Sequence, residues 1–229
     1  MFTIVGGMTS PSIPNRGRPA RLDRAKTVGT ALELLDELGL EALTMRRLAD
    51  RLGVQAGALY RHFTTKQDLL TAMAERMLGD VQVSPGAADW AERLRALARA
   101  MRRALLAHRD GARVFGGTHS VGPHTLAFAE SVLGVLREAG FKDEDAARTL
   151  MAMVNFTLGH TLEEQAATAP LENGTPEDPD RLRSAVLAGS YPHLAATLPV
   201  LTSTDFDAHF EFALDVHIEG LRHLRPRAA

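Results

Sequence analysis

Residues 44–66, TMRRLADRLGVQAGALYRHFTTK, constrain the fold more than any other stretch, because they predict two short helices joined by a tight turn. Thr44 is a typical helix N-cap, and in the octet 45–52 the apolar residues fall on one stripe. Gly53 can adopt the left-handed conformation that ends a helix at little cost. A second helix is expected over 55–62, with small residues first and polar aromatic residues last. Such a pair is typical of a helix-turn-helix motif.

A helical hairpin buried inside a bundle is the alternative interpretation of this stretch. Such a hairpin has no need of the basic and polar aromatic side chains that crowd it: Arg46, Arg47, Arg51, Tyr60, Arg61, His62 and Lys66. The charge distribution also favours the helix-turn-helix. Residues 16–66 hold 10 Lys and Arg against 6 Asp and Glu, whereas residues 67–229 hold 16 against 22, for a net charge of −2. An excess of positive charge confined to the motif is what a DNA-binding module requires.

Residues 1–21 predict a flexible basic arm ahead of the motif. The first 15 residues carry no charged side chain and include two glycines and two prolines. They are followed by Arg16-Gly17-Arg18-Pro19-Ala20-Arg21. A slim, extended backbone that carries arginines suits a narrow minor groove of DNA, which makes Arg16, Arg18 and Arg21 candidate DNA contacts. A solvated tail that touches only phosphates is an equally open alternative.

Composition excludes several other classes of protein. The chain has no cysteine, so disulfides and thiolate metal sites are impossible. The lack of disulfides agrees with the expected location in the cytoplasm. No apolar run approaches the ~18 residues of a membrane span, so no membrane partner is expected. The amino terminus is apolar but lacks the positive leader and the long apolar stretch of a signal peptide.

The rest of the sequence predicts helices, and the expected fold class is all-α. A first helix over 22–38 should pack behind the motif, which gives a three-helix DNA-binding domain over 22–68. Thr65 and Asp68 have the spacing of a capping box that opens the next helix. A larger helical domain is expected over 69–229, with helices at 89–108, 126–140, 143–167, 181–188 and 205–224, a broken segment at 111–123 and a mobile loop at 169–180.

Two of the expected helices carry further information. The helix over 143–167 is apolar on nearly every side, so in a domain of this size a partner chain should cover one face, with the 205–224 helix as its companion. The helix over 89–108 carries Arg95, Arg99, Arg102 and Arg103 away from its apolar face. A solvated face is the favoured interpretation of these arginines, and contact with DNA is the alternative.

An enzyme is a poor fit to the sequence. His160 with Glu163 and Glu164 forms an H-x-x-E face, but a di-iron bundle needs a second such pair and two more carboxylates on facing helices. Nucleophile-elbow and phosphate-binding glycine motifs are also lacking. No catalytic residue, cofactor or metal site is therefore expected, and the H-x-x-E face is interpreted as a polar patch at the dimer seam or in a pocket.

Several segments of the chain resemble the TetR family of DNA-binding regulators. The resemblance at the amino-terminal end rests on Arg21-Leu22-Asp23, ALELLDELGLEALTMRRLADRLGV and Leu59-Tyr60-Arg61-His62. ALLAHRDGARV at 104–114, Gly140-Phe141, Phe156-Thr157-Leu158-Gly159 and Leu162-Glu163 resemble the regulatory domain of the tetracycline-repressor branch. The resemblance implies a homodimer whose 143–167 and 205–224 helices form a four-helix bundle, with one inducer pocket per subunit and a double-stranded DNA operator as partner.

Arg46, Tyr60, His62 and Lys66 match the family's DNA-contacting positions. The complete set of candidate DNA contacts is Arg16, Arg18, Arg21, Thr44, Arg46, Gln55, Ala56, Ala58, Tyr60, Arg61, His62 and Lys66. At the start of the recognition helix, Ala56, Gly57 and Ala58 stand where the tetracycline-repressor branch has larger base-reading residues. The operator is therefore expected to differ from that of the branch.

The positions that match the branch's ligand pocket have changed further. Phe115 stands where the branch has the histidine that holds drug-bound magnesium, and most hydrogen-bonding positions are replaced. The candidate ligand-binding residues are Leu97, Met101, Phe115, Thr118, His119, Val132, Asn155 and Glu163. They imply a repressor that is released by a small, mainly apolar organic inducer without a metal. A regulator of the same fold that lacks an inducer and is controlled by a protein partner is the alternative.

Overall fold

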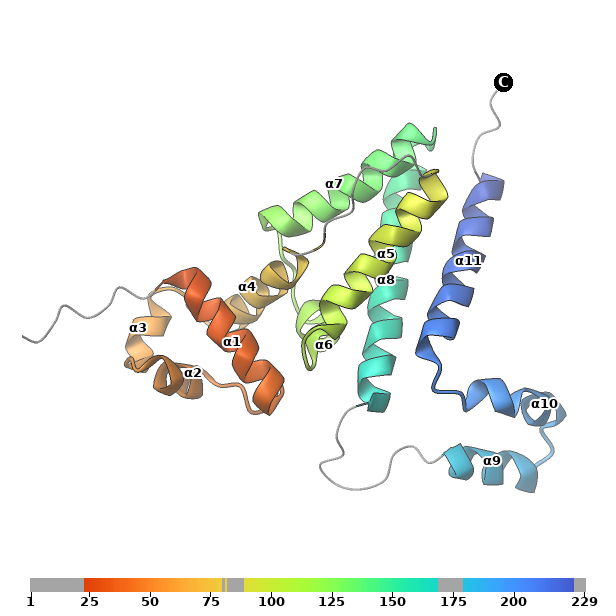
Figure 1. Cartoon of the computed structure of the whole chain (residues 1–229), viewed down its shortest axis with the longest axis horizontal. Coiled ribbons are helices and arrows are strands. Elements are labelled where there is room, and N and C mark those ends of the chain that lie inside the picture. The colour runs from red at the N-terminus through yellow and green to blue at the C-terminus, as the bar shows by residue number, and fades with distance from the viewer. Residues whose placement is uncertain (1–22, 80, 82–88, 169–178, 225–229) are drawn as a thin grey trace, which may run out of the picture.

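The computed structural model describes residues 23–79, 81, 89–168 and 179–224, and these residues form eleven helices and no strand (Figure 1). The expected all-α fold is confirmed. The helices are α1 (Arg24–Leu38), α2 (Met45–Leu52), α3 (Ala56–Tyr60), α4 (Lys66–Leu78), α5 (Trp90–Leu106), α6 (Gly111–Gly116), α7 (Pro123–Glu138), α8 (Asp143–Thr168), α9 (Pro179–Ala188), α10 (Pro192–Leu201) and α11 (Phe206–Leu224).

Local capping signals place the first two helices where the sequence predicts them. The Asp23 side chain accepts a hydrogen bond from the Ala25 amide at the start of α1, and Gly39, with φ of 79°, ends it. The Thr44 hydroxyl accepts from the Arg47 amide at 3.2 Å and begins α2. Gly53 ends α2 in the left-handed region with φ of 66°. The turn between α2 and α3 is therefore set by one glycine.

The second helix of the motif is shorter than predicted. It spans only Ala56–Tyr60, and the next two residues form a turn rather than the last turn of a helix. The prediction of a helix over 55–62 is therefore wrong at both ends. Leu59 and Phe63 are both completely buried, so a five-residue helix is held in place by two apolar anchors rather than by its own hydrogen bonds.

Helix α4 joins the amino-terminal helices to the rest of the molecule. The predicted capping box is present, because the Thr65 hydroxyl accepts from the Asp68 amide and the Asp68 carboxylate accepts from the Thr65 amide, both at 3.0 Å. Helix α4 packs against α1 on one side and against α6 and α7 on the other. The expected boundary at residues 68–69 thus falls inside one continuous helix.

The larger part of the molecule is built around α5, α7 and α8, which pack on one another. The expected apolar face of α5 is buried at Leu94, Leu97, Met101 and Leu105. The segment 111–123, expected to be broken, contains the short helix α6, and α10 was not predicted. In Figure 1 the pair α9 and α10 stands apart from α1–α8. None of the described helices is long and apolar enough to cross a bilayer.

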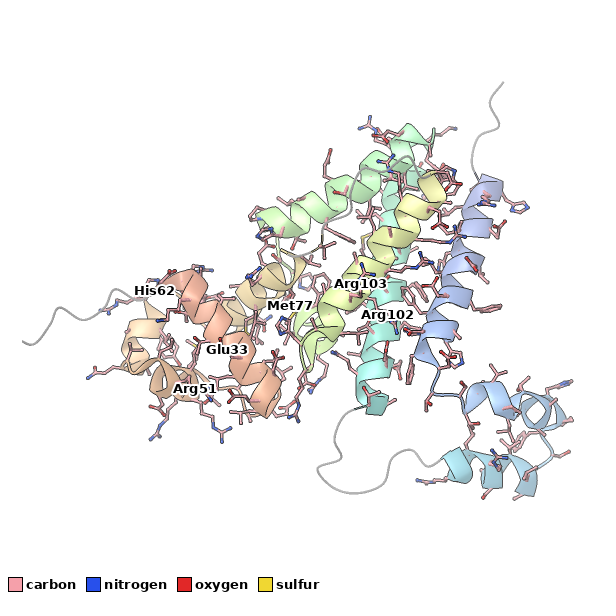
Figure 2. The ribbon with its side chains drawn as sticks, viewed as in Figure 1. Glu33, Arg51, His62, Met77, Arg102 and Arg103 are labelled. Carbon is pink, nitrogen blue, oxygen red and sulfur yellow. The ribbon has the colours of Figure 1, made fainter. Side chains whose placement is uncertain are left out.

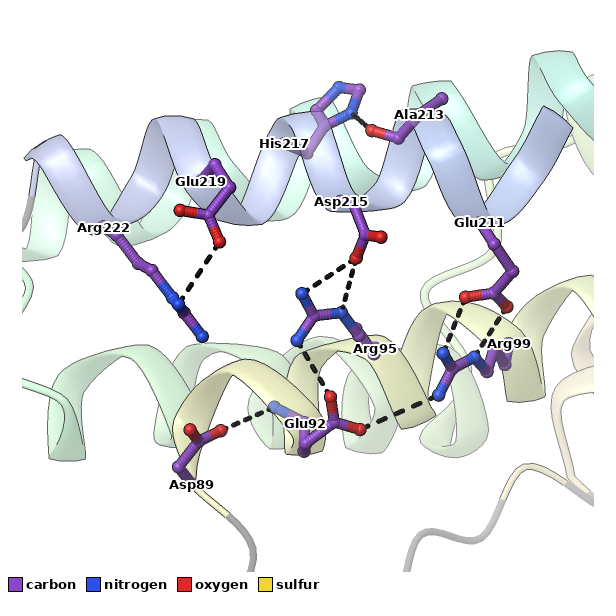
Figure 3. Close-up of polar contacts among 10 residues, drawn as sticks. All are labelled: Asp89, Glu92, Arg95, Arg99, Glu211, Ala213, Asp215, His217, Glu219 and Arg222. Atoms are coloured by element: carbon purple, nitrogen blue, oxygen red, sulfur yellow. Dashed lines mark hydrogen bonds and ion pairs between the residues drawn. The ribbon is translucent and has the colours of Figure 1, made fainter. Parts of the chain in front are cut away.

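Three of the four arginines of α5 hold α11 against the rest of the molecule, so the expectation of a solvated arginine face is wrong for Arg95, Arg99 and Arg102 and is met only by the exposed Arg103. Figure 3 shows Arg95 bound to Asp215 and Arg99 bound through two hydrogen bonds to Glu211. One turn further along, Arg102 bridges Glu164 of α8 and Asp207 of α11. Its guanidinium lies 5.0 Å from the ring centroid of Phe210. These three arginines therefore do not face DNA.

Helix α8 buries one face in this chain and exposes another. Met153 and Thr157 are buried, whereas Met151 is 59% exposed. Helix α11 similarly exposes Phe212 and Val216 beside its buried Phe210. The apolar residues of α8 thus occupy both a covered and an uncovered face, which is the pattern that motivated the prediction of a partner chain.

The turn after α2 yields a stability prediction. A Cβ at Gly53 would meet no atom within 4 Å, so the substitution Gly53→Ala acts only through the left-handed backbone. We expect it to lower the free energy of unfolding by about 1–2 kcal/mol. Gly29, inside α1 and equally open, is the matched control, and Gly29→Ala should raise stability by about 0.5–1 kcal/mol. Urea denaturation of both variants measures this, and equal effects would contradict the backbone explanation.

Two neighbouring arginines of α5 provide a second prediction (Figure 2). The Arg102 side chain is 11% exposed and its partner Glu164 is 14% exposed, so Arg102→Ala leaves a mostly buried carboxylate without its cation. We expect a loss of about 1–3 kcal/mol in the free energy of unfolding. Arg103 is exposed, and Arg103→Ala should change stability by less than about 0.5 kcal/mol. Similar values for both variants in chemical denaturation would contradict a structural role for the Arg102 bridge.

Candidate functional site

The helices α2 and α3 present an exposed face at the end of the molecule opposite α11 (Figure 1). Arg46, Gln55, Tyr60 and Arg61 lie on the surface, and the Tyr60 side chain is 51% exposed. Gly57 is also exposed but has no side chain, so the side chains at the surface of α3 come from its neighbours. An element of this size can enter the major groove of DNA.

The end of α3 is fixed by α1. The Arg24 Nη1 donates a hydrogen bond to the His62 carbonyl at 2.8 Å, and the Arg24 guanidinium lies 4.5 Å from the centroid of the Phe63 ring. Arg24 is therefore a supporting residue that the sequence interpretation missed. Its only sequence signal is its place at the start of α1, which does not reveal a partner 38 residues away.

The cations of this face differ in what they already bind. Arg47 donates to the Ala42 carbonyl, Arg51 pairs with Glu37, and the Lys66 Nζ donates to the Leu40 carbonyl at 3.3 Å. Arg46 and Arg61 are exposed and contact no acceptor among the described residues. These two arginines are thus the candidate DNA contacts whose charge is fully available to an external anion.

The remaining candidate DNA contacts have more mixed surroundings. Thr44 is exposed, but its hydroxyl is used as the α2 cap. Ala56, Ala58 and His62 are half-buried, and Ala56 packs against the core. Ala56 and Ala58 therefore expose less surface than Tyr60 and Arg61. Arg16, Arg18 and Arg21 lie outside the described residues.

The candidate ligand-binding residues fall into three places rather than one. Leu97, Met101 and Val132 are buried among α5 and α7, and the half-buried Phe115 of α6 packs against the same core. The Thr118 hydroxyl donates to the Phe115 carbonyl at 2.9 Å, and the exposed His119 follows it in the link to α7. Asn155 and Glu163 lie on the exposed side of α8. A single chain therefore does not bring all eight residues together.

Three of the surface clefts formed by the described residues lie beside these elements. A cleft of about 1010 Å³ lies between α1, α4 and the start of α7, and His119 is the candidate ligand residue that lines it. A largely apolar groove of about 530 Å³ runs between α8 and α11 and includes Phe156 and Leu214. A third, of about 490 Å³, lies between the end of α1 and the start of α6. Leu97, Met101 and Val132 line none of these three.

His160 lies in a mostly buried aromatic environment rather than in a ligand cluster. Its ring is 5.2 Å from that of Phe210, and its Nδ1 is buried without a hydrogen-bond partner. Burial and, to a lesser degree, the nearby Arg102 charge lower the pKa of His160 below its ordinary value. Glu164 is held by Arg102, while Glu163 is exposed. The described part of the chain contains no group of three His, Cys, Asp or Glu arranged to hold a metal ion.

The run at 104–114 forms a polar joint between the end of α1 and the turn before α6. The Asp36 carboxylate accepts from the Arg109 amide at 2.9 Å and contacts His108 Nδ1 at 3.0 Å. The Asp110 carboxylate accepts from the Leu40 amide at 2.8 Å. Arg113 pairs with both Asp110 and Glu41. The segment that carries the resemblance to the tetracycline-repressor branch thus connects the two parts of this molecule.

Gln165 ties α8 to the same joint. Its side chain accepts from the Ala112 amide at 2.9 Å and donates to the His108 carbonyl at 2.8 Å. The same amide group also donates to the Leu105 carbonyl at 3.2 Å. Gln165 was missed in the sequence because a glutamine on an exposed-looking stretch of helix carries no signal of three distant backbone partners.

Comparison with known proteins agrees with the arrangement of an amino-terminal helix-turn-helix and a larger helical domain. The family model described as "Bacterial regulatory proteins, tetR family" matches residues 28–73, and the model "Tetracyclin repressor-like, C-terminal domain" matches residues 82–225. The chain is 42% identical to the class C tetracycline repressor protein of Escherichia coli over 209 residues, which is 90% of this chain and 93% of that protein.

Two solved structures extend the comparison to three dimensions. A possible TetR family transcriptional regulator from Streptomyces coelicolor A3(2) is 65% identical with a TM-score of 0.81, over 89% of this chain and 100% of that one. Streptomyces coelicolor ActR in complex with actinorhodin is 33% identical with a TM-score of 0.82, over 92% and 100% of the two chains. The chain belongs to the TetR family of bacterial transcriptional regulators, with a tetracycline repressor-like C-terminal domain.

Proposed function

We propose that this TetR-family regulator acts as a homodimeric repressor, which binds a pseudo-palindromic operator and is released by a small, mainly apolar organic inducer. The observation that carries the DNA-binding part is the exposed face of α2 and α3 with two uncommitted arginines, Arg46 and Arg61. This face can meet phosphates without first giving up an internal ion pair, whereas Arg51 would lose Glu37. A repressor of this kind works on DNA in the cytoplasm.

The proposal of a homodimer rests on the uncovered apolar faces of α8 and α11. Met151, Phe212 and Val216 are each more than half exposed, at 59%, 73% and 57%. A second copy related by a two-fold axis would cover these side chains and form a four-helix bundle. Asn155 and Glu163 lie on α8 as well, so the partner chain would lie next to them. Two recognition helices in one dimer then read half-sites about 34 Å apart.

The proposal of an apolar inducer rests on the chemistry of the candidate ligand positions. Leu97, Met101 and Val132 offer no hydrogen bond, and a ligand rich in hydroxyls would leave groups unpaired at about 1–3 kcal/mol each. Phe115 has no lone pair for a metal, whereas Mg²⁺ requires nearly octahedral hard ligands. Relatives support a small-molecule site in this fold, since ActR has been solved with actinorhodin and a TetR variant from Acinetobacter baumannii with minocycline.

A regulator without an inducer, controlled by a protein partner, is the second candidate. The observation that favours it is the tight packing of Leu97, Met101 and Val132, which are at most 3% exposed. A ligand could enter among them only after the helices separate. The two candidates differ in whether any small molecule stabilises the free protein.

The DNA-binding face generates a prediction about salt dependence. Arg46→Ala and Arg61→Ala should each weaken binding to a selected operator and reduce the slope of log K against log salt by about one unit, because each removes one phosphate neutralisation. Arg103→Ala removes the same charge from an exposed site on α5 and should leave the slope unchanged. Fluorescence anisotropy at several salt concentrations gives the slopes. Unchanged slopes for both motif variants would refute the proposed contact face.

The ligand positions generate a prediction about specificity. Tetracycline should not release the operator at micromolar concentration, with or without magnesium, because Phe115 cannot coordinate the metal. In contrast, at least one member of a panel of mainly apolar organic compounds, including actinorhodin, should raise the melting temperature and release DNA. A compound present at 100 times its Kd stabilises the folded protein by about 2.7 kcal/mol. Magnesium-dependent release by tetracycline that EDTA abolishes would contradict the inducer proposal, and a panel without any stabilising compound would favour the protein-partner candidate.

A further inference from the structure

Helix α7 begins without a cap of its own. Its N-cap residue is Gly122, which has no side chain to accept a hydrogen bond, and Pro123 follows at the first helical position. The amides of His124 and Thr125 are therefore donors that the helix itself cannot satisfy. Most helices supply a Ser, Thr, Asp or Asn at this point. The sequence of α7 thus leaves its N-terminus dependent on another segment.

Glu75 of α4 supplies the missing acceptor. Its Oε1 accepts a hydrogen bond from the His124 amide, while its Oε2 accepts from the Thr125 amide at 3.2 Å and from the Thr125 hydroxyl at 2.7 Å. The Ser120 hydroxyl also donates to Oε2, at 2.9 Å, and accepts from the Gly122 amide at 3.1 Å. One carboxylate thus satisfies the first turn of a helix that begins 48 positions later. Its negative charge also suits the positive end of the helix dipole.

The surroundings of Glu75 are shaped to fit the carboxylate. A Cβ at Gly122 would overlap the Glu75 carboxylate, so only glycine allows this approach. Burial by itself raises the pKa of Glu75, but the hydrogen bonds from Thr125, His124 and Ser120 outweigh it and lower the pKa below its ordinary value. The carboxyl group is therefore ionised throughout the neutral range, and the contact does not depend on protonation there.

Glu75 lies on the helix that connects the DNA-binding domain to the regulatory domain. Helix α4 begins at Lys66, next to α3, and Glu75 lies in its last turn and a half. About nine residues at 1.5 Å each place the carboxylate roughly 13 Å along the helix from the DNA-binding end. Helix α7 buries Phe128, Val132 and Leu136 against the regulatory core. Glu75 therefore joins the helix that enters the DNA-binding domain to a helix of the regulatory core.

We propose that Glu75 is the residue that couples α7 to α4, so that the state of the regulatory domain reaches the helix-turn-helix through a helix cap made between domains. A shift of α7 moves the groups that hold Glu75, and α4 must follow or lose the three hydrogen bonds that α7 donates to this carboxylate. The link to operator binding rests on the proposed function, whereas the mechanical link between α4 and α7 does not.

The first experiment measures the mechanical link without DNA or ligand. Because the chain has no cysteine, Glu33→Cys on α1 and Arg103→Cys on α5 give two unique label sites on exposed residues of the two domains (Figure 2). Labelled chains are diluted with unlabelled protein, and double electron–electron resonance gives the distance distribution within one chain. We expect Glu75→Ala to widen this distribution at least twofold. Glu130→Ala is the matched control, because Glu130 is an exposed glutamate of α7 without a hydrogen bond or ion pair among the described residues.

The second experiment measures the cap by amide hydrogen exchange. Glu75→Ala should speed exchange of the His124 and Thr125 amides about tenfold, the factor expected when a helix cap is lost. Glu75→Gln keeps the shape but removes the charge, and it should change exchange in the same direction by a smaller factor. The Glu75→Gln variant also tests the cap if Glu75→Ala does not fold. Glu130→Ala should leave both amides at the wild-type rate.

The third measurement separates coupling from local structure. A duplex selected by the wild-type protein from a random library is added, and exchange over residues 118–126 is compared with and without DNA. Since coupling is reciprocal, DNA should slow this exchange at least threefold in the wild type and have no effect in Glu75→Ala, although the variant still binds the duplex. Thr125→Val, which removes one hydroxyl contact, should give an intermediate response.

The outcomes separate the two proposals. Failure to select any duplex would refute the proposed function, while the distance measurement would still decide the mechanical link. A distance distribution that is the same in wild type, Glu75→Ala and Glu75→Gln would overturn the inference. Equal DNA-dependent slowing over residues 118–126 in wild type and Glu75→Ala, or no slowing in the wild type, would overturn it as well.

Discussion

The continuity of α4 is the constraint on which the arrangement of the two domains depends. A capping box fixes its first turn at Thr65, directly after the recognition segment, and its apolar residues then pack in turn on α1, α6 and α7. A helix is stiff over this length because every internal residue adds a hydrogen bond to the same ladder. The helix-turn-helix therefore cannot rotate against the regulatory domain without moving α4. Of the polar joints between the two parts of the molecule, Glu75 lies on α4 itself, whereas Asp36 and Asp110 join the end of α1 directly to the segment before α6.

The arginines of this protein illustrate how one residue type serves opposite purposes. Arg99 and Arg102 are held by carboxylates of α8 and α11 and stabilise the regulatory domain. Arg46 and Arg61 contact no acceptor among the described residues, so their charge is exposed to solvent and to any anion that approaches. The difference lies in the geometry of neighbouring helices. The paired arginines neutralise the negative charge of acidic residues on α11. The electrostatic potential at the surface of α2 and α3 therefore depends largely on the unpaired Arg46 and Arg61.

Local signals account for the parts of the fold that were predicted correctly. Caps at Thr44 and Thr65 and the stop at Gly53 depend on neighbours within four residues, so they can be recognised without knowing the fold. Helix α10 was missed because its mostly apolar sequence, with prolines at 192 and 199, has no clear amphipathic period, and α6 because two glycines bound a very short helix. Helix α3 was overestimated, since tertiary anchors at Leu59 and Phe63 rather than local propensity set its length.

The sequence by itself determined the all-helical class, the helix-turn-helix and its family, and the concentration of basic residues around that motif, because these show in the order of residues along the chain. Only the tertiary structure decided which of those cations are free, that Asn155 and Glu163 lie apart from Leu97 and Val132, and that Glu75 caps α7. Such contacts join residues tens of positions apart. Their partners are chosen by how helices pack, which leaves no periodic trace in the sequence of either helix.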